Sequence, residues 1–165
     1  MKARFLHTSD WQLGVTRQFL SADSQARWSE AWFEGVRNLG RIAKEELCEF
    51  IVVAGDVFES NQVERKTVLK ACEAMAGIEV PIYLLPANHD PLDAASVFSS
   101  KPWKDRKPAK VHVLDTMGKI FEVRPGTCYL VAQDQSRKSL ALELVSTHSN
   151  TTGGDAKIES TVKSS

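Results

Sequence analysis

The pattern of hydrophobic and polar residues predicts three short strands in the first half of the chain. They are Arg4–Thr8, which leans apolar, Phe50–Ala54, a continuous apolar run, and Val80–Leu85, interrupted near its start by Pro81. The middle run is rich in β-branched residues and ends at Gly55. That composition is typical of a strand buried on both faces of a parallel sheet.

Two helices are predicted between these strands. The first has apolar side chains at spacings of three and four, namely Trp28, Trp32, Val36, Leu39, Ala43 and Leu47. Asp23 or Ser24 is its expected N-cap. Core packing is the preferred interpretation of this tryptophan-rich stripe, and a ligand platform is the alternative. The second helix is expected over Val63–Ala76, so strands and helices alternate, which predicts parallel strands joined by right-handed crossovers.

The second half of the chain has a different pattern. Lys101–Lys110 is basic and contains prolines, so an exposed loop is predicted there. Short strands separated by Gly, Pro or polar residues are expected at Val111–Leu114, Ile120–Val123, Cys128–Ala132 and Leu140–Ser146, giving a half richer in antiparallel strand. Ser149–Ser165 is small and polar and is predicted to be a flexible tail. The expected organisation is one domain over residues 1–148 and a tail over residues 149–165.

Composition excludes few classes of protein. The chain has 165 residues, 42% hydrophobic and 25% charged, which suits one soluble globular domain. Lys+Arg and Asp+Glu both number 21, which excludes a strongly basic DNA-coating protein. A nuclease is not excluded, because local charge or a bound metal can hold a phosphate.

Cellular location is predicted from the cysteines and from apolar runs. Cys48, Cys72 and Cys128 show no metal-ligand spacing and are expected to be reduced and mostly buried, as in a cytoplasmic protein. The first residues lack the apolar stretch of a signal peptide. No run approaches the roughly 20 apolar residues of a membrane span, so no membrane partner is expected.

A polar cluster follows each of the three predicted parallel strands. These clusters are Asp10-Trp11-Gln12, Gly55-Asp56-Val57-Phe58-Glu59 and Asn88-His89-Asp90. The carboxyl ends of parallel strands share one edge of the sheet, where ligands bind. Carboxylate, amide and imidazole groups together suit Mn²⁺, Mg²⁺, Fe or Zn²⁺. A shared metal site is therefore predicted, although each cluster alone is also typical of a turn.

The segments FLHTSDWQLG, VVAGDVFES and PANHDP resemble the first three motifs of the calcineurin-like metallophosphoesterases. They are most similar to the SbcD-type DNA-repair nuclease subunits and the YhaO-like phosphoesterases, over roughly Met1 to Phe98. The resemblance implies an α/β fold, a metallophosphoesterase-like layered αββα sandwich. Its parallel βαβαβ first half would be followed by a strand-rich second half that is incomplete in this chain.

The resemblance also implies roles for individual residues. Asp10 would bind a first metal ion, Asp56 would bridge two ions, and Asn88 would bind the second. His89 would face the scissile phosphate as a general acid or charge stabiliser, and Glu59 would orient it. Two divalent ions can clamp a phosphodiester during hydrolysis, and Mn²⁺ is the expected metal, with Mg²⁺ as the alternative.

Three positions depart from the family pattern. Gln12 replaces the histidine of the usual Asp-x-His. Its amide oxygen can bind a hard cation, which favours Mn²⁺ or Mg²⁺. The alternative is that Gln12 only forms a hydrogen bond to a nearby group. Ala87 replaces a glycine and would be strained if its φ were positive. The late Gly-His-x-His pair is missing, and His148 is the candidate for the other late histidine ligand, with a surface histidine as the alternative. The chain is interpreted as truncated, as the product of a split or frame-shifted gene, or as a degenerate member.

The implied activity is that of a Mn²⁺-dependent phosphodiesterase or exonuclease acting on DNA ends in double-strand-break repair. DNA, an SbcC-type coiled-coil ATPase and a second copy of the chain are the expected partners. The alternatives are a binding or scaffold module with little activity, and a phosphodiesterase that acts on nucleotides or small phosphodiesters. Lys101–Lys110, with Trp103 in it, is a candidate contact to phosphate and base, although a solvated loop is the preferred interpretation.

Overall fold

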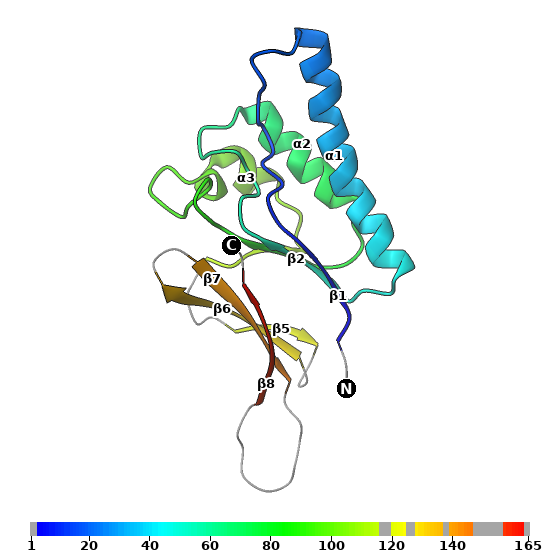
Figure 1. Cartoon of the computed structure of the whole chain (residues 1–165), viewed down its shortest axis with the longest axis vertical. Coiled ribbons are helices and arrows are strands. Elements are labelled where there is room, and N and C mark those ends of the chain that lie inside the picture. The colour runs from blue at the N-terminus through cyan, green and yellow to red at the C-terminus, as the bar shows by residue number, and fades with distance from the viewer. Residues whose placement is uncertain (1–2, 116–119, 125–127, 137–138, 147–156, 164–165) are drawn as a thin grey trace, which may run out of the picture.

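The structure is a computed structural model that describes residues 3–115, 120–124, 128–136, 139–146 and 157–163. These residues form two four-stranded sheets, and helices cover the outer face of the first sheet (Figure 1). The fold is α/β, as expected. The described part of the chain supplies three of the four layers of an αββα sandwich: helices, parallel sheet and antiparallel sheet.

The first sheet is entirely parallel. Its strands lie in the order β1 (Phe5–Thr8), β2 (Phe50–Ala54), β3 (Ile82–Leu85) and β4 (Val111–Val113). The first three strands were predicted. The fourth was expected in the antiparallel half, but it pairs with β3 in parallel because a helix returns the chain to the same edge before it begins.

Helix α1 (Ala22–Glu45) begins two residues earlier than the first of the two predicted caps allows. Its N-cap is Ser21, whose Oγ accepts a hydrogen bond from the Ser24 N–H at 3.3 Å, so the expectation of Asp23 or Ser24 was wrong. The apolar stripe is only partly core. Val36 and Ala43 are buried, whereas the Trp32 side chain is 38% exposed and Leu47, beyond the helix end, is 77% exposed.

The segment predicted as a basic loop is largely helical. It contains helix α3 (Lys101–Arg106), which follows helix α2 (Arg65–Ala76) and a 3₁₀ turn (Val97–Ser99) along the chain. Ser100 caps α3 by accepting a hydrogen bond from the Trp103 N–H at 3.4 Å. Trp103 is buried, with its ring 5.2 Å from that of Phe98 in an edge contact. The proposed role of Trp103 as a base-stacking residue was therefore wrong.

Strand β2 is buried on both faces, as its apolar run predicted. Ile51 and Val53 belong to the core beneath the helices. Phe50 and Val52 belong to a second core that includes Leu130 of the antiparallel sheet. The strand therefore lies between the helical layer and the second sheet, which fixes the position of the loop that follows it.

The second sheet is antiparallel. Its strands lie in the order β5 (Ile120–Arg124), β6 (Cys128–Ser136), β7 (Ser139–Ser146) and β8 (Lys157–Lys163). Strand β8 falls in the range predicted to be a flexible tail, so that expectation was wrong for residues 157–163; its β-branched residues favour strand once β7 offers an edge. The rest of residues 149–165 lies outside the described residues, and the division into a domain and a tail stays a prediction.

The three cysteines are buried free thiols, in line with the prediction. Burial raises the pKa of the Cys72 thiol to about 11, so this thiol is neutral at ordinary pH. Within the described ranges, no helix combines the length and the apolar character that crossing a membrane requires.

Candidate metal centre

The loops after β1, β2 and β3 meet at one edge of the parallel sheet. The Asp10 N–H donates to the Gly55 carbonyl at 3.2 Å, and the Gln12 N–H donates to the Asp56 carbonyl at 2.8 Å. The His89 N–H donates to Asp56 Oδ1 at 3.1 Å. Three motifs that are distant in sequence are thus joined by direct hydrogen bonds, with Asp56 in the middle.

The backbone of this edge is held in an unusual conformation. Asp10, Gln12 and Asp56 have φ angles of 53°, 43° and 50°. Leu47, at the end of α1, is the remaining non-glycine residue with positive φ in the described part of the chain. This conformation costs an L-residue about 1–2 kcal/mol and clusters at functional sites. Three of the four cases fall on candidate metal ligands.

Gly55 allows the second and third loops to approach each other. Its φ is +98°, and a Cβ atom at this position would lie 2.9 Å from the Ala87 Cβ. Ala87 itself is not among the residues with positive φ, so the alanine that replaces the family glycine is not strained. The close approach requires glycine at position 55 rather than at position 87.

Asp90 ties the same two loops together from below the surface. Its side chain is fully buried; Oδ2 accepts from the Phe58 N–H and Oδ1 from the Ala87 N–H, each at 3.0 Å. Burial raises the pKa of the Asp90 carboxyl, and the backbone hydrogen bonds oppose that rise. Asp90 therefore serves the loops and has no oxygen without a backbone partner to offer a metal.

His89 is oriented by a main-chain group. Its Nδ1 lies 2.9 Å from the Glu59 carbonyl oxygen; a carbonyl only accepts, so Nδ1 carries the proton. This hydrogen bond raises the pKa of His89, and the charges of Asp56, Glu59 and Asp90 raise it further. The expected partner, Glu59, does contact His89, but through its carbonyl oxygen rather than its carboxylate.

The remaining donors differ in exposure and fit an oxygen-preferring cation. Asp10 and Asn88 are exposed, whereas Gln12 and Asp56 are half-buried. Across the described ranges, no three His, Cys, Asp or Glu side chains are grouped to hold a metal, so a centre there depends on amide oxygens beside two carboxylates. Such a set suits Mg²⁺ or Mn²⁺, which keep water ligands, better than Zn²⁺. His148 lies outside the described residues.

Sequence reasoning found the motifs but missed their supports. The residue pattern carried no specific signal for three features of the site. These are the positive φ angles of Asp10 and Asp56, the hydrogen bond to the Glu59 carbonyl, and the two backbone hydrogen bonds that Asp90 accepts. The His112 ring stacks on that of Tyr83, with the centroids 5.1 Å apart.

Comparison with known proteins agrees with this geometry. A family model described as calcineurin-like phosphoesterase matches residues 3–155. The SbcD component of nuclease SbcCD from Rhodobacter capsulatus is 30% identical over 121 residues, which cover 70% of this chain and 27% of that protein. The SbcD component of nuclease SbcCD from Bacillus subtilis is 31% identical over 100 residues, which cover 58% of this chain and 24% of that protein. The chain spans about a quarter of the length of both relatives.

Proposed function

Because this chain belongs to the calcineurin-like phosphoesterase family, whose members typically bind two metal ions, we propose that it is a metal-dependent nuclease that hydrolyses phosphodiesters at DNA ends in double-strand-break repair. The observation that carries the proposal is the left-handed backbone at Asp10, Gln12 and Asp56, at the edge where His89 binds Asp56. The names of the two relatives support DNA as the substrate.

The metal ligands follow from the order of the loops. Asp10 and Gln12 would hold one ion, Asn88 a second, and Asp56, between them, would contact both. His148 is a further candidate ligand. Mn²⁺ is the proposed metal and Mg²⁺ the alternative. When bound, such ions neutralise charge on the phosphate oxygens and align the ester for in-line displacement.

His89 supplies the proton in this proposal. Its Nδ1–H is engaged by the Glu59 carbonyl, which leaves Nε2 to donate to the oxygen of the departing group. A raised pKa increases the fraction of His89 that carries the second proton near neutral pH. Its side chain is exposed and is therefore open to a bound ester.

A binding module with little turnover is the competing function. It is favoured because the described residues include no group of three His, Cys, Asp or Glu side chains placed to hold a metal ion. Both relatives are named as one subunit of the SbcCD nuclease, so a coiled-coil ATPase subunit is a proposed partner for either function. A second copy of this chain is the other proposed partner.

Cleavage of end-labelled duplex DNA with Mn²⁺ separates the two functions. The chain is expected to shorten the DNA with Mn²⁺ and not with chelator. Asp56→Asn should lower the rate by at least about 100-fold, since outer-shell changes alone cost 10–100-fold. Asp105→Asn, the same change at an exposed position of α3, is the matched control. Cleavage that persists in chelator, or equal rates for the two variants, would contradict the proposal.

A further inference from the structure

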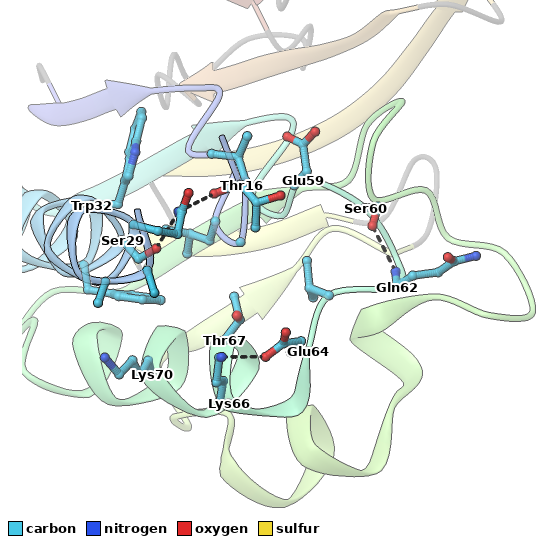
Figure 2. Close-up of a pocket in the computed structure, with 18 residues that line it drawn as sticks. Thr16, Ser29, Trp32, Glu59, Ser60, Gln62, Glu64, Lys66, Thr67 and Lys70 are labelled. Atoms are coloured by element: carbon cyan, nitrogen blue, oxygen red, sulfur yellow. Dashed lines mark hydrogen bonds and ion pairs between the residues drawn. The ribbon is translucent and has the colours of Figure 1, made fainter. Parts of the chain in front are cut away.

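A groove of about 730 Å³ opens between α1 and α2, beside the candidate metal centre. Figure 2 shows Ser29 and Trp32 from α1 on one side and Lys66, Thr67 and Lys70 from α2 below them. The loop after β1 and the connection after β2 close the remaining side. Ligand sites typically measure about 300–1,000 Å³, so the groove has the size of a small-molecule site.

The groove adjoins the edge that carries His89, and Glu59 is common to both. The Leu13 N–H donates to the Val57 carbonyl at 2.9 Å, and the Glu59 N–H donates to the Leu13 carbonyl at 3.2 Å. Leu13 and Glu59 both line the groove, and the Glu59 carbonyl is also the partner of His89 Nδ1. Glu59 is therefore the point at which an ester bound at the metal edge would reach the groove.

Trp32 gives the groove an accessible aromatic wall. Its side chain is 38% exposed, although its neighbour Phe33 is buried in the core. The Trp28 ring meets it in an edge contact, with centroids 5.6 Å apart and planes at 80°. That contact supports the indole from one side. Exposed indoles of this kind stack on the flat faces of nucleobases.

The charges along the groove are balanced rather than basic. Lys66 Nζ lies 2.8 Å from Glu64 Oε2, and both residues line the groove. The other lysine, Lys70, lies 2.7 Å from Glu30. A surface that follows a nucleic-acid backbone needs excess positive charge. This surface instead offers hydroxyl and amide groups, from Thr16, Ser29 and Gln62, which suit the neutral polar atoms of a base and sugar.

We propose that this groove binds the nucleoside portion of the substrate, with the base against Trp32. The assignment rests on the proposed function for the position of the phosphate. The nucleoside has two sources, a free nucleotide ester or the terminal nucleotide of a DNA strand. The groove would in either case select esters that carry a nucleoside beside the scissile phosphate.

Adenosine, which has no phosphate, tests the groove without metal or turnover. The four tryptophans give four indole N–H signals in a ¹H–¹⁵N spectrum, and Trp32→Phe identifies one of them. Added adenosine is expected to shift the Trp32 signal saturably and to leave that of buried Trp103 in place. Trp32→Ala should weaken binding by about tenfold, since stacking contributes a factor of this order, whereas Phe19→Ala, an exposed aromatic outside the groove, should not. An unmoved Trp32 signal would overturn the proposal.

Kinetics with Mn²⁺ distinguish nucleoside binding in the groove from hydrolysis at the metal centre. Trp32→Ala should raise KM about tenfold for thymidine 5′-(p-nitrophenyl phosphate) and leave it unchanged for methyl p-nitrophenyl phosphate, which lacks the nucleoside. Equal effects on both esters would contradict the groove assignment alone. Adenosine binding without hydrolysis of either ester would contradict the proposed function alone. A raised KM for an oligonucleotide as well would identify the terminal nucleotide of a strand as an occupant.

Discussion

His89→Ala is expected to lower turnover by about 10²–10⁴-fold, the contribution of a positioned general acid, while Mn²⁺ affinity stays unchanged. The two effects separate because His89 reaches Asp56 through its backbone N–H, which alanine retains. The imidazole itself bonds to the Glu59 carbonyl and takes no part in ligating the metal. Only the proton donor is removed.

The measurement is kcat for end-labelled duplex DNA, whose alkoxide leaving group needs a proton, beside a Mn²⁺ titration of the same variant. His7→Ala is the matched control, because His7 is an exposed histidine on β1. Turnover that survives His89→Ala would remove the proposed acid. Loss of Mn²⁺ binding in this variant would instead make His89 a ligand.

Asp90→Ala is expected to destabilise the fold by about 3 kcal/mol, because it leaves two backbone N–H groups without their partner, at about 1–3 kcal/mol each. The groups belong to Phe58 and Ala87, and the carboxylate that they bind is fully buried. Asp90→Asn should cost less, since the amide keeps one acceptor oxygen. The loops that carry Asp56 and His89 should loosen together.

Urea unfolding followed by circular dichroism measures this loss. Asp105→Ala, on the exposed face of α3, should change the free energy of unfolding by less than about 0.5 kcal/mol. If Asp90→Ala were as mild as Asp105→Ala, the carboxylate would not be what holds the two loops.

The parallel sheet could be predicted because β2 is apolar at every position and polar clusters follow the strands. Strand β4 could not, because its short pattern does not say which sheet it joins. Trp103 was predicted to lie in an exposed loop because its segment is basic and contains prolines. The segment is helical because Ser100 caps the start of α3. Strand β8 could not be predicted either, because its mostly polar residues pair with β7, which is a tertiary effect.

The candidate site also has one part that could be predicted from the sequence and one part that could not. Asp10, Asp56 and His89 were identified because side-chain type and spacing carry metal chemistry. The groups that position them are backbone atoms and angles, which residue identity encodes weakly. Gly55 is an example: the need for glycine comes from Ala87, 32 positions away on the neighbouring loop. Trp32 was interpreted as core because helical spacing alone does not show where the buried face ends.

The most direct test of the metal centre is a calorimetric Mn²⁺ titration of the chain, of Asp56→Asn and of Asp105→Asn. Saturable binding is expected in the unsubstituted chain, with affinity weakened by at least about 10–100-fold in Asp56→Asn and unchanged in Asp105→Asn. Two sites that weaken together would indicate that Asp56 is shared between two ions. Absent binding, or identical isotherms for all three proteins, would contradict a metal centre at this edge of the sheet.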